Sequence, residues 1–214
     1  MPDPLVDNLL DWFCRCRPTP SVQTLDINGL ASTDDIPTVC NLIRHLGSSL
    51  EHLLISCTDS DEGGVRSKCI SDSDFINASL IILSAALSKQ IDLSRNTSLR
   101  DITFRKIRLY ANSRRPPSCG WITAIVSGLP HPSLEFVTIA IFLGDVKEIE
   151  ALELSALENL FLKHPLSNNS TKLCFYIIAT SSTDREEVQA ALEDRLPKLD
   201  GMKRLEFNMF VIIL

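Results

Sequence analysis

The chain has 214 residues, of which 44% are apolar and 22% are charged, so its length and composition suit a single globular domain with a sizeable core. Its net charge of −6 gives no reason to expect a nucleic-acid or anionic-membrane partner. The seven cysteines are scattered and odd in number, and the start carries acids where a signal peptide needs bases, so we expect a cytoplasmic or nuclear protein.

The first twenty residues are predicted to form a capping helix followed by a proline-rich link. Residues 4–16 place four large apolar side chains on one helical face, namely Leu5, Leu9, Trp12 and Phe13. Pro18 and Pro20 then end the helix. We expect this stripe to cover the open apolar end of the domain that follows, residues 21–214.

From residue 21 onward, a strand pattern L-x-x-L-x-φ, in which φ is apolar, alternates with helical patterns. Six such units are predicted, with apolar positions at Val22, Leu25 and Ile27; Leu50, Leu53 and Ile55; Leu99, Ile102 and Phe104; Leu134, Val137 and Ile139; Leu173, Tyr176 and Ile178; and Met202, Leu205 and Phe207. The helical patterns cover about 35–46, 75–89, 121–129, 152–160 and 185–199, and an exposed insertion is expected at 57–74.

The repeated strand-and-helix unit predicts an α/β fold of the leucine-rich-repeat-like solenoid kind, with irregular repeats, a curved parallel sheet inside and helices outside. Two alternatives remain open. A doubly wound α/β enzyme with an unrecognised site also alternates strands and helices. The chain could also be an incomplete or non-functional gene product.

Two stretches carry a resemblance to a known family. The sequence SVQTLDINGLASTDDIPTVCNLIRHLGSSLEHLLI at 21–55 and the sequence IDLSRNTSLRDITFRKIRL at 91–109 resemble the repeat region of mushroom-type fungal F-box proteins. The resemblance implies a protein-interaction scaffold that recognises substrates for a ubiquitin ligase. No F-box precedes the first repeat, so we expect this chain alone not to bind the Skp1 adaptor. The asparagine usual in leucine-rich repeats is replaced by Leu30, Ile107 and Phe142.

The sequence offers no constellation that predicts catalysis, a cofactor or a bound metal, and we expect a protein that is not an enzyme. Cys14-x-Cys16 lacks a second pair for zinc, and the acidic stretch at 59–70 ends in Ile70 where a calcium loop needs glutamate. The stretch at 71–74 and the four dispersed histidines read as ordinary surface. A basic cluster is interpreted as a solvated face that could meet an acidic partner: Arg100, Arg105, Lys106, Arg108, Arg114 and Arg115.

Alternation along each strand predicts which side chains face the concave side of the sheet. The middle row is Asp26, Leu54, Thr103, Thr138, Ile177 and Glu206. The flanking row is Thr24, His52, Asp101, Phe136, Phe175 and Arg204. Apolar side chains gather in the fourth and fifth units, so we expect an unknown protein partner to contact Phe136, Phe175 and Ile177. The alternative is that a loop or residues 211–214 cover these side chains.

Overall fold

The structure is a computed structural model that describes residue 15 and residues 21–30, 33–57, 86–108, 120–129, 133–150, 152–163, 171–180 and 183–212. The predicted capping helix, apart from Arg15, lies outside the described residues. The acidic stretch at 59–70, which was compared with a calcium loop, and the stretch at 71–74 also lie outside them, as do Cys14 and Cys16.

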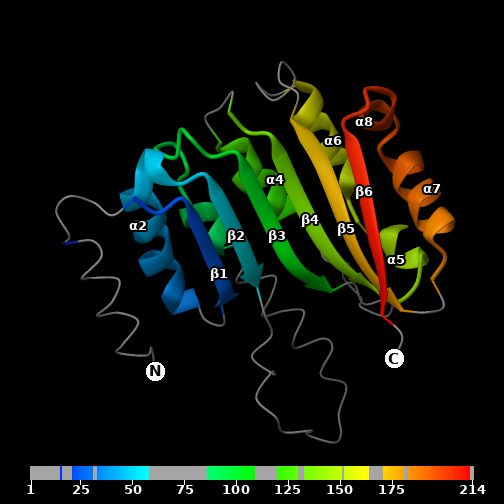
Figure 1. The fold of residues 1–214 in the computed structure, drawn as a ribbon, viewed down its shortest axis with the longest axis horizontal. Coiled ribbons are helices and arrows are strands. Elements are labelled where there is room, and N and C mark those ends of the chain that lie inside the picture. Colours follow the sequence, from blue (N-terminus) through cyan, green and yellow to red (C-terminus); the bar gives the residue numbers. More distant parts are fainter. Residues whose placement is uncertain are drawn as a thin grey trace, which may run out of the picture.

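A single six-stranded sheet organises the described chain (Figure 1). All its strands are parallel and lie in sequence order: β1 (Thr24–Leu30), β2 (His52–Cys57), β3 (Asp101–Arg108), β4 (Phe136–Leu143), β5 (Lys172–Thr180) and β6 (Leu205–Ile212). The coarse prediction of an α/β fold with a parallel sheet is therefore confirmed. A doubly wound sheet requires a reversal of the strand order, and the sheet formed by the described residues has none.

Among the described residues, helices cover one face of the sheet and none covers the other face (Figure 1). They are α2 (Ile36–Leu46), α4 (Gly120–Ser127), α5 (Lys147–Glu150), α6 (Leu154–Lys163), α7 (Arg185–Arg195) and α8 (Pro197–Gly201). Two short 3-10 helices, η1 (Thr33–Asp35) and η2 (Gly47–Ser49), flank α2, and residues 86–90 are also helical.

The core lies between the sheet and the helices, and the strand pattern explains why. In units two to four, the second and third apolar positions are buried on the helical side, and the first apolar position is buried just before each strand. Phe104 of β3 meets Trp121 of α4 edge to face, with ring centroids 5.2 Å apart. Each large apolar side chain buried in this way contributes roughly 1.5–3 kcal/mol.

Helix α2 shows how one connection is closed. Pro37 occupies its first turn, and Gly47 ends it with a positive φ of 51° that a side chain would strain. Asn96, a buried residue 49 positions further on, donates from Nδ2 to the carbonyls of Ile43 (3.0 Å) and Gly47 (2.9 Å). Each of these carbonyls also accepts a backbone N–H, Ile43 from Gly47 and Gly47 from Leu50, so the distant asparagine adds a second hydrogen bond to both at the end of the helix.

The prediction for the fifth and sixth units is wrong in part. Leu173 of β5 pairs with Val137 of β4, and the side chains of β5 that belong to the core are Leu173, Phe175, Ile177 and Ala179. Tyr176 and Ile178, predicted to point inward, therefore lie on the opposite face of the sheet. In the sixth unit Met202, also predicted to point inward, is 49% exposed, whereas Leu205 and Phe207 pack against the core as expected.

Candidate protein-binding face

The face of the sheet that the helices leave uncovered, called the open face below, is built from every second residue of the strands. The predicted rows are confirmed on β1 to β4, since Thr24 pairs with His52, His52 with Asp101, and Asp101 with Phe136. The middle row pairs in the same way from Asp26 to Thr138. It continues through Cys174 to Glu206.

The structure separates the three residues that were predicted to meet a partner. Phe136 is partly buried on the open face, where it was expected. Phe175 and Ile177 are both 0% exposed and lie in the core, so the expectation that they form an exposed cluster is wrong. The pairing register places Lys172 beside Phe136 and Cys174 beside Thr138 instead.

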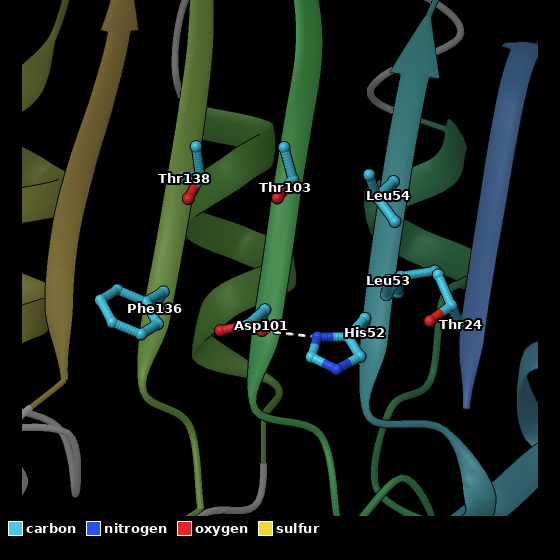
Figure 2. A pocket seen from close by; sticks show the side chains of 8 residues that line it. All are labelled: Thr24, His52, Leu53, Leu54, Asp101, Thr103, Phe136 and Thr138. Atoms are coloured by element: carbon cyan, nitrogen blue, oxygen red, sulfur yellow. Dashed lines mark hydrogen bonds and ion pairs between the residues drawn. The ribbon is translucent and has the colours of Figure 1, made fainter. Parts of the chain in front are cut away.

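A hollow of about 480 Å³ lies on the open face over β1 to β4. Figure 2 shows Asp101 of β3 between His52 of β2 and Phe136 of β4. His52 Nδ1 donates to Asp101 Oδ2 at 2.5 Å, because an ionised carboxylate can only accept. The remaining lining comes from Thr24, Leu53, Leu54, Thr103 and Thr138.

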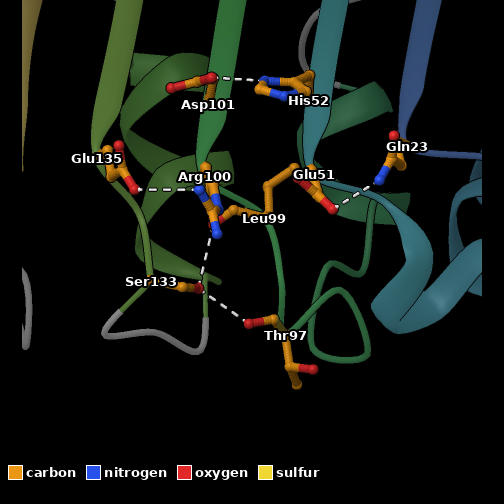
Figure 3. A network of polar contacts seen from close by, with 9 residues as sticks. All are labelled: Gln23, Glu51, His52, Thr97, Leu99, Arg100, Asp101, Ser133 and Glu135. Atoms are coloured by element: carbon orange, nitrogen blue, oxygen red, sulfur yellow. Dashed lines mark hydrogen bonds and ion pairs between the residues drawn. The ribbon is translucent and has the colours of Figure 1, made fainter.

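Below the hollow, polar contacts join the segments that enter neighbouring strands (Figure 3). Gln23 donates to Glu51 at 3.1 Å, and Arg100 lies 3.8 Å from Glu135. The hydroxyl of Ser133 donates to the carbonyls of Thr97 (2.9 Å) and Leu99 (3.2 Å). These contacts join the entry of each strand to that of the previous one, although the Arg100–Glu135 pair is more than half exposed on both sides and so contributes little.

The ion pairs account for part of the predicted basic cluster. Arg105 contacts Asp26 at 3.1 Å on the open face, and Arg100 pairs with Glu135. Lys106 and Arg108 lie in β3, but the structure describes only their backbone. Arg114 and Arg115 lie outside the described residues. The interpretation as an acidic-partner site therefore stays a prediction.

Across β5 and β6, three side chains form a second polar group. Lys172 pairs with Glu206, which also accepts from the thiol of Cys174 at 3.5 Å. Burial and the charge and hydrogen bond of Glu206 raise the pKa of Cys174 to about 12. The hydrogen bond from Lys172 lowers the pKa of Glu206 and raises that of Lys172. The thiol is thus held in its protonated, unreactive form.

The carboxyl ends of β4 to β6 carry an apolar strip, which we call the aromatic ridge: Phe142, Tyr176, Ile178 and Phe210. Phe142 pairs with Ile178, and Ile178 pairs with Phe210. The rings of Tyr176 and Phe210 stack with centroids 4.9 Å apart at 21°, and these two residues are 39% and 51% exposed. The sequence would have predicted this ridge if the inward positions of β5 had been assigned one residue earlier. A shift of one residue moves every side chain of a strand to the other face of the sheet.

The described residues contain no group of three or more His, Cys, Asp or Glu side chains that could hold a metal ion. Within the same residues, no helix is long and apolar enough to cross a membrane. Comparison of the chain with protein-family models, with curated proteins and with solved structures finds no match in any of the three.

Proposed function

We propose that this chain is a protein-interaction scaffold of the leucine-rich-repeat-like solenoid kind and that its open face binds a protein partner. Two features support this proposal. The strands follow one another in sequence order in one parallel sheet, and the helices of the described segments cover only one face of that sheet. Such an arrangement offers a broad surface of regularly spaced side chains on which a partner can lie.

The aromatic ridge is the observation that carries the proposal. Tyr176 and Phe210 are stacked together and remain more than one third exposed, beside Phe142 and Ile178. Contiguous exposed apolar side chains are uncommon on monomeric proteins and mark interaction sites. Aromatic side chains are also among the residues that contribute most to binding energy. The resemblance to F-box proteins adds the further proposal that the partner is a substrate of a ubiquitin ligase.

The ridge can be tested with peptides selected from a displayed random library against the wild-type chain. The selected peptides are measured by isothermal titration on the wild type and on a Tyr176→Ser, Phe210→Ser double variant. Because each binding hot spot is worth about 2 kcal/mol or more, we expect at least tenfold weaker binding to the variant.

The matched control is Met202→Ser, which removes an exposed apolar side chain that does not belong to the open face. Its affinity for the selected peptides should equal that of the wild type, and thermal unfolding checks that every variant is folded. Peptides that bind the ridge variant as tightly as the wild type, or a chain that selects no peptide, would overturn the proposal.

A further inference from the structure

We propose that the hollow over β1 to β4 receives a lysine or arginine side chain of the protein partner. This inference rests on the proposed function, since it names the chemistry of one part of the partner that the open face would bind. The argument depends on the charge of the hollow, on its unused hydrogen-bond acceptors and on the position of Phe136.

The lining of the hollow contains one carboxylate, one histidine and no lysine or arginine. Asp101 is its single acidic lining residue, and its Oδ2 atom already accepts from His52. The Oδ1 atom of the same carboxylate is buried and has no hydrogen-bond partner among the described residues, which makes it an orphaned acceptor at the wall of the hollow. The carboxylate therefore retains unused acceptor capacity.

The neighbouring cations of the described residues are already engaged elsewhere. Arg105 contacts Asp26, Arg100 lies beside Glu135, and Lys172 pairs with Glu206. None of the three lines the hollow. The negative charge of Asp101 is therefore not balanced by a lysine or arginine of the described chain.

The rest of the lining suits the head and the stem of a basic side chain. The hydroxyls of Thr24, Thr103 and Thr138 line the hollow, and no hydrogen bond of theirs is formed with the described residues. The Phe136 ring stands on the far side of Asp101 from His52 (Figure 2), where it can stack on a cation. Leu54 offers apolar contact to the methylene stem.

Other occupants fit less well for a physical reason. An apolar side chain would remove water from Asp101 without replacing its hydrogen bonds, which is costly. A carboxylate of the partner would be repelled by Asp101 at short range. An ammonium or guanidinium group instead forms a charge-assisted hydrogen bond with the carboxylate.

The test uses the peptides selected on the wild-type chain in the library experiment. Peptides should be enriched in lysine or arginine at one fixed distance from their apolar residues. Binding should weaken roughly tenfold or more when that basic residue is replaced by norleucine, or when the chain carries Asp101→Asn, which keeps the shape of the side chain. The control Glu135→Gln makes the same change of charge outside the hollow and should weaken binding less than twofold.

The outcomes distinguish this inference from the proposed function. Peptides that lose affinity for the ridge variant but bind Asp101→Asn as tightly as the wild type would overturn the inference and leave the proposed function standing. Equal losses in Asp101→Asn and Glu135→Gln would also overturn it, because the effect would then be general electrostatics. A chain that selects no peptide would remove both proposals.

Discussion

Arg204, which lies just before β6, is predicted to be the largest single polar contributor to stability in the C-terminal part of the sheet. Its side chain was expected on the concave face, but the residue is only 6% exposed. Its Nε donates to the carbonyl of Thr171 at 2.9 Å, and its Nη1 donates to the carbonyl of Phe161 at 3.2 Å. The guanidinium also lies 5.6 Å from the centroid of the Phe161 ring.

The substitution Arg204→Met retains an unbranched apolar stem and removes both donors. A hydrogen bond from a charged donor contributes about 1.5–3 kcal/mol, and a buried carbonyl left without a partner costs about 1–3 kcal/mol. These two contributions overlap, and water can reach the freed carbonyls, so we expect the free energy of unfolding to fall by roughly 3 kcal/mol. Burial lowers the pKa of Arg204, but arginine stays protonated throughout the neutral range, so this loss should not depend on pH near 7.

The assay is urea unfolding followed by circular dichroism, supported by the melting temperature, which should fall by about 6–12 °C in a chain of this size. Arg204→Lys should recover only part of the loss, because a lysine cannot present a planar fork to two carbonyls. The control Lys198→Met removes one exposed positive charge from α8 and should change stability by less than about 0.5 kcal/mol. An Arg204→Met variant within 0.5 kcal/mol of the wild type would refute the reasoning.

Three further outcomes follow from the fold. Phe175→Ala should lower the free energy of unfolding by about 3–5 kcal/mol because the ring is fully buried, and a small change in urea unfolding would contradict its place in the core. Asn96→Ala should cost about 1–3 kcal/mol and speed hydrogen exchange at the end of α2; unchanged exchange there would count against its capping role. Cys174, whose pKa is about 12, should resist iodoacetamide at pH 8, whereas Glu206→Gln should lower that pKa and speed alkylation measured by mass spectrometry; rapid labelling of the folded wild type would contradict this.

The sequence was sufficient to predict which face of the sheet each side chain occupies in the strands whose two faces differ in polarity. In β2 and β3, His52, Asp101 and Thr103 alternate with buried aliphatic or aromatic residues, so the face of each side chain was predicted correctly. In β5 the segment KLCFYIIAT is apolar on both faces, and alternation cannot decide between the two possible registers. The pairing of Val137 with Leu173, which only the folded sheet supplies, resolves the choice.

Parts of the site depend on contacts between residues distant in sequence. Alternation placed His52 and Asp101 in one row, but it did not predict that their side chains meet or that the surface is hollowed there. Arg204 and Asn96 were missed for the same reason, since each satisfies carbonyls of a different unit. Asn96 lies between Arg95 and Thr97, and Arg204 follows Lys203, so each stands among other polar residues and no local pattern distinguishes it.

The sequence order of the strands has a mechanical consequence. Each interior strand is hydrogen-bonded only to the preceding and following strands of the chain, and β6 is bonded to β5 alone within the described sheet. Since β1 is likewise bonded to β2 alone in that sheet, force applied between the first and last residues would load the two outer ladders, β1–β2 and β5–β6, before any interior ladder. The chain should lengthen in successive steps, each releasing one strand with its helix, and a force–extension trace would resolve these steps as separate peaks.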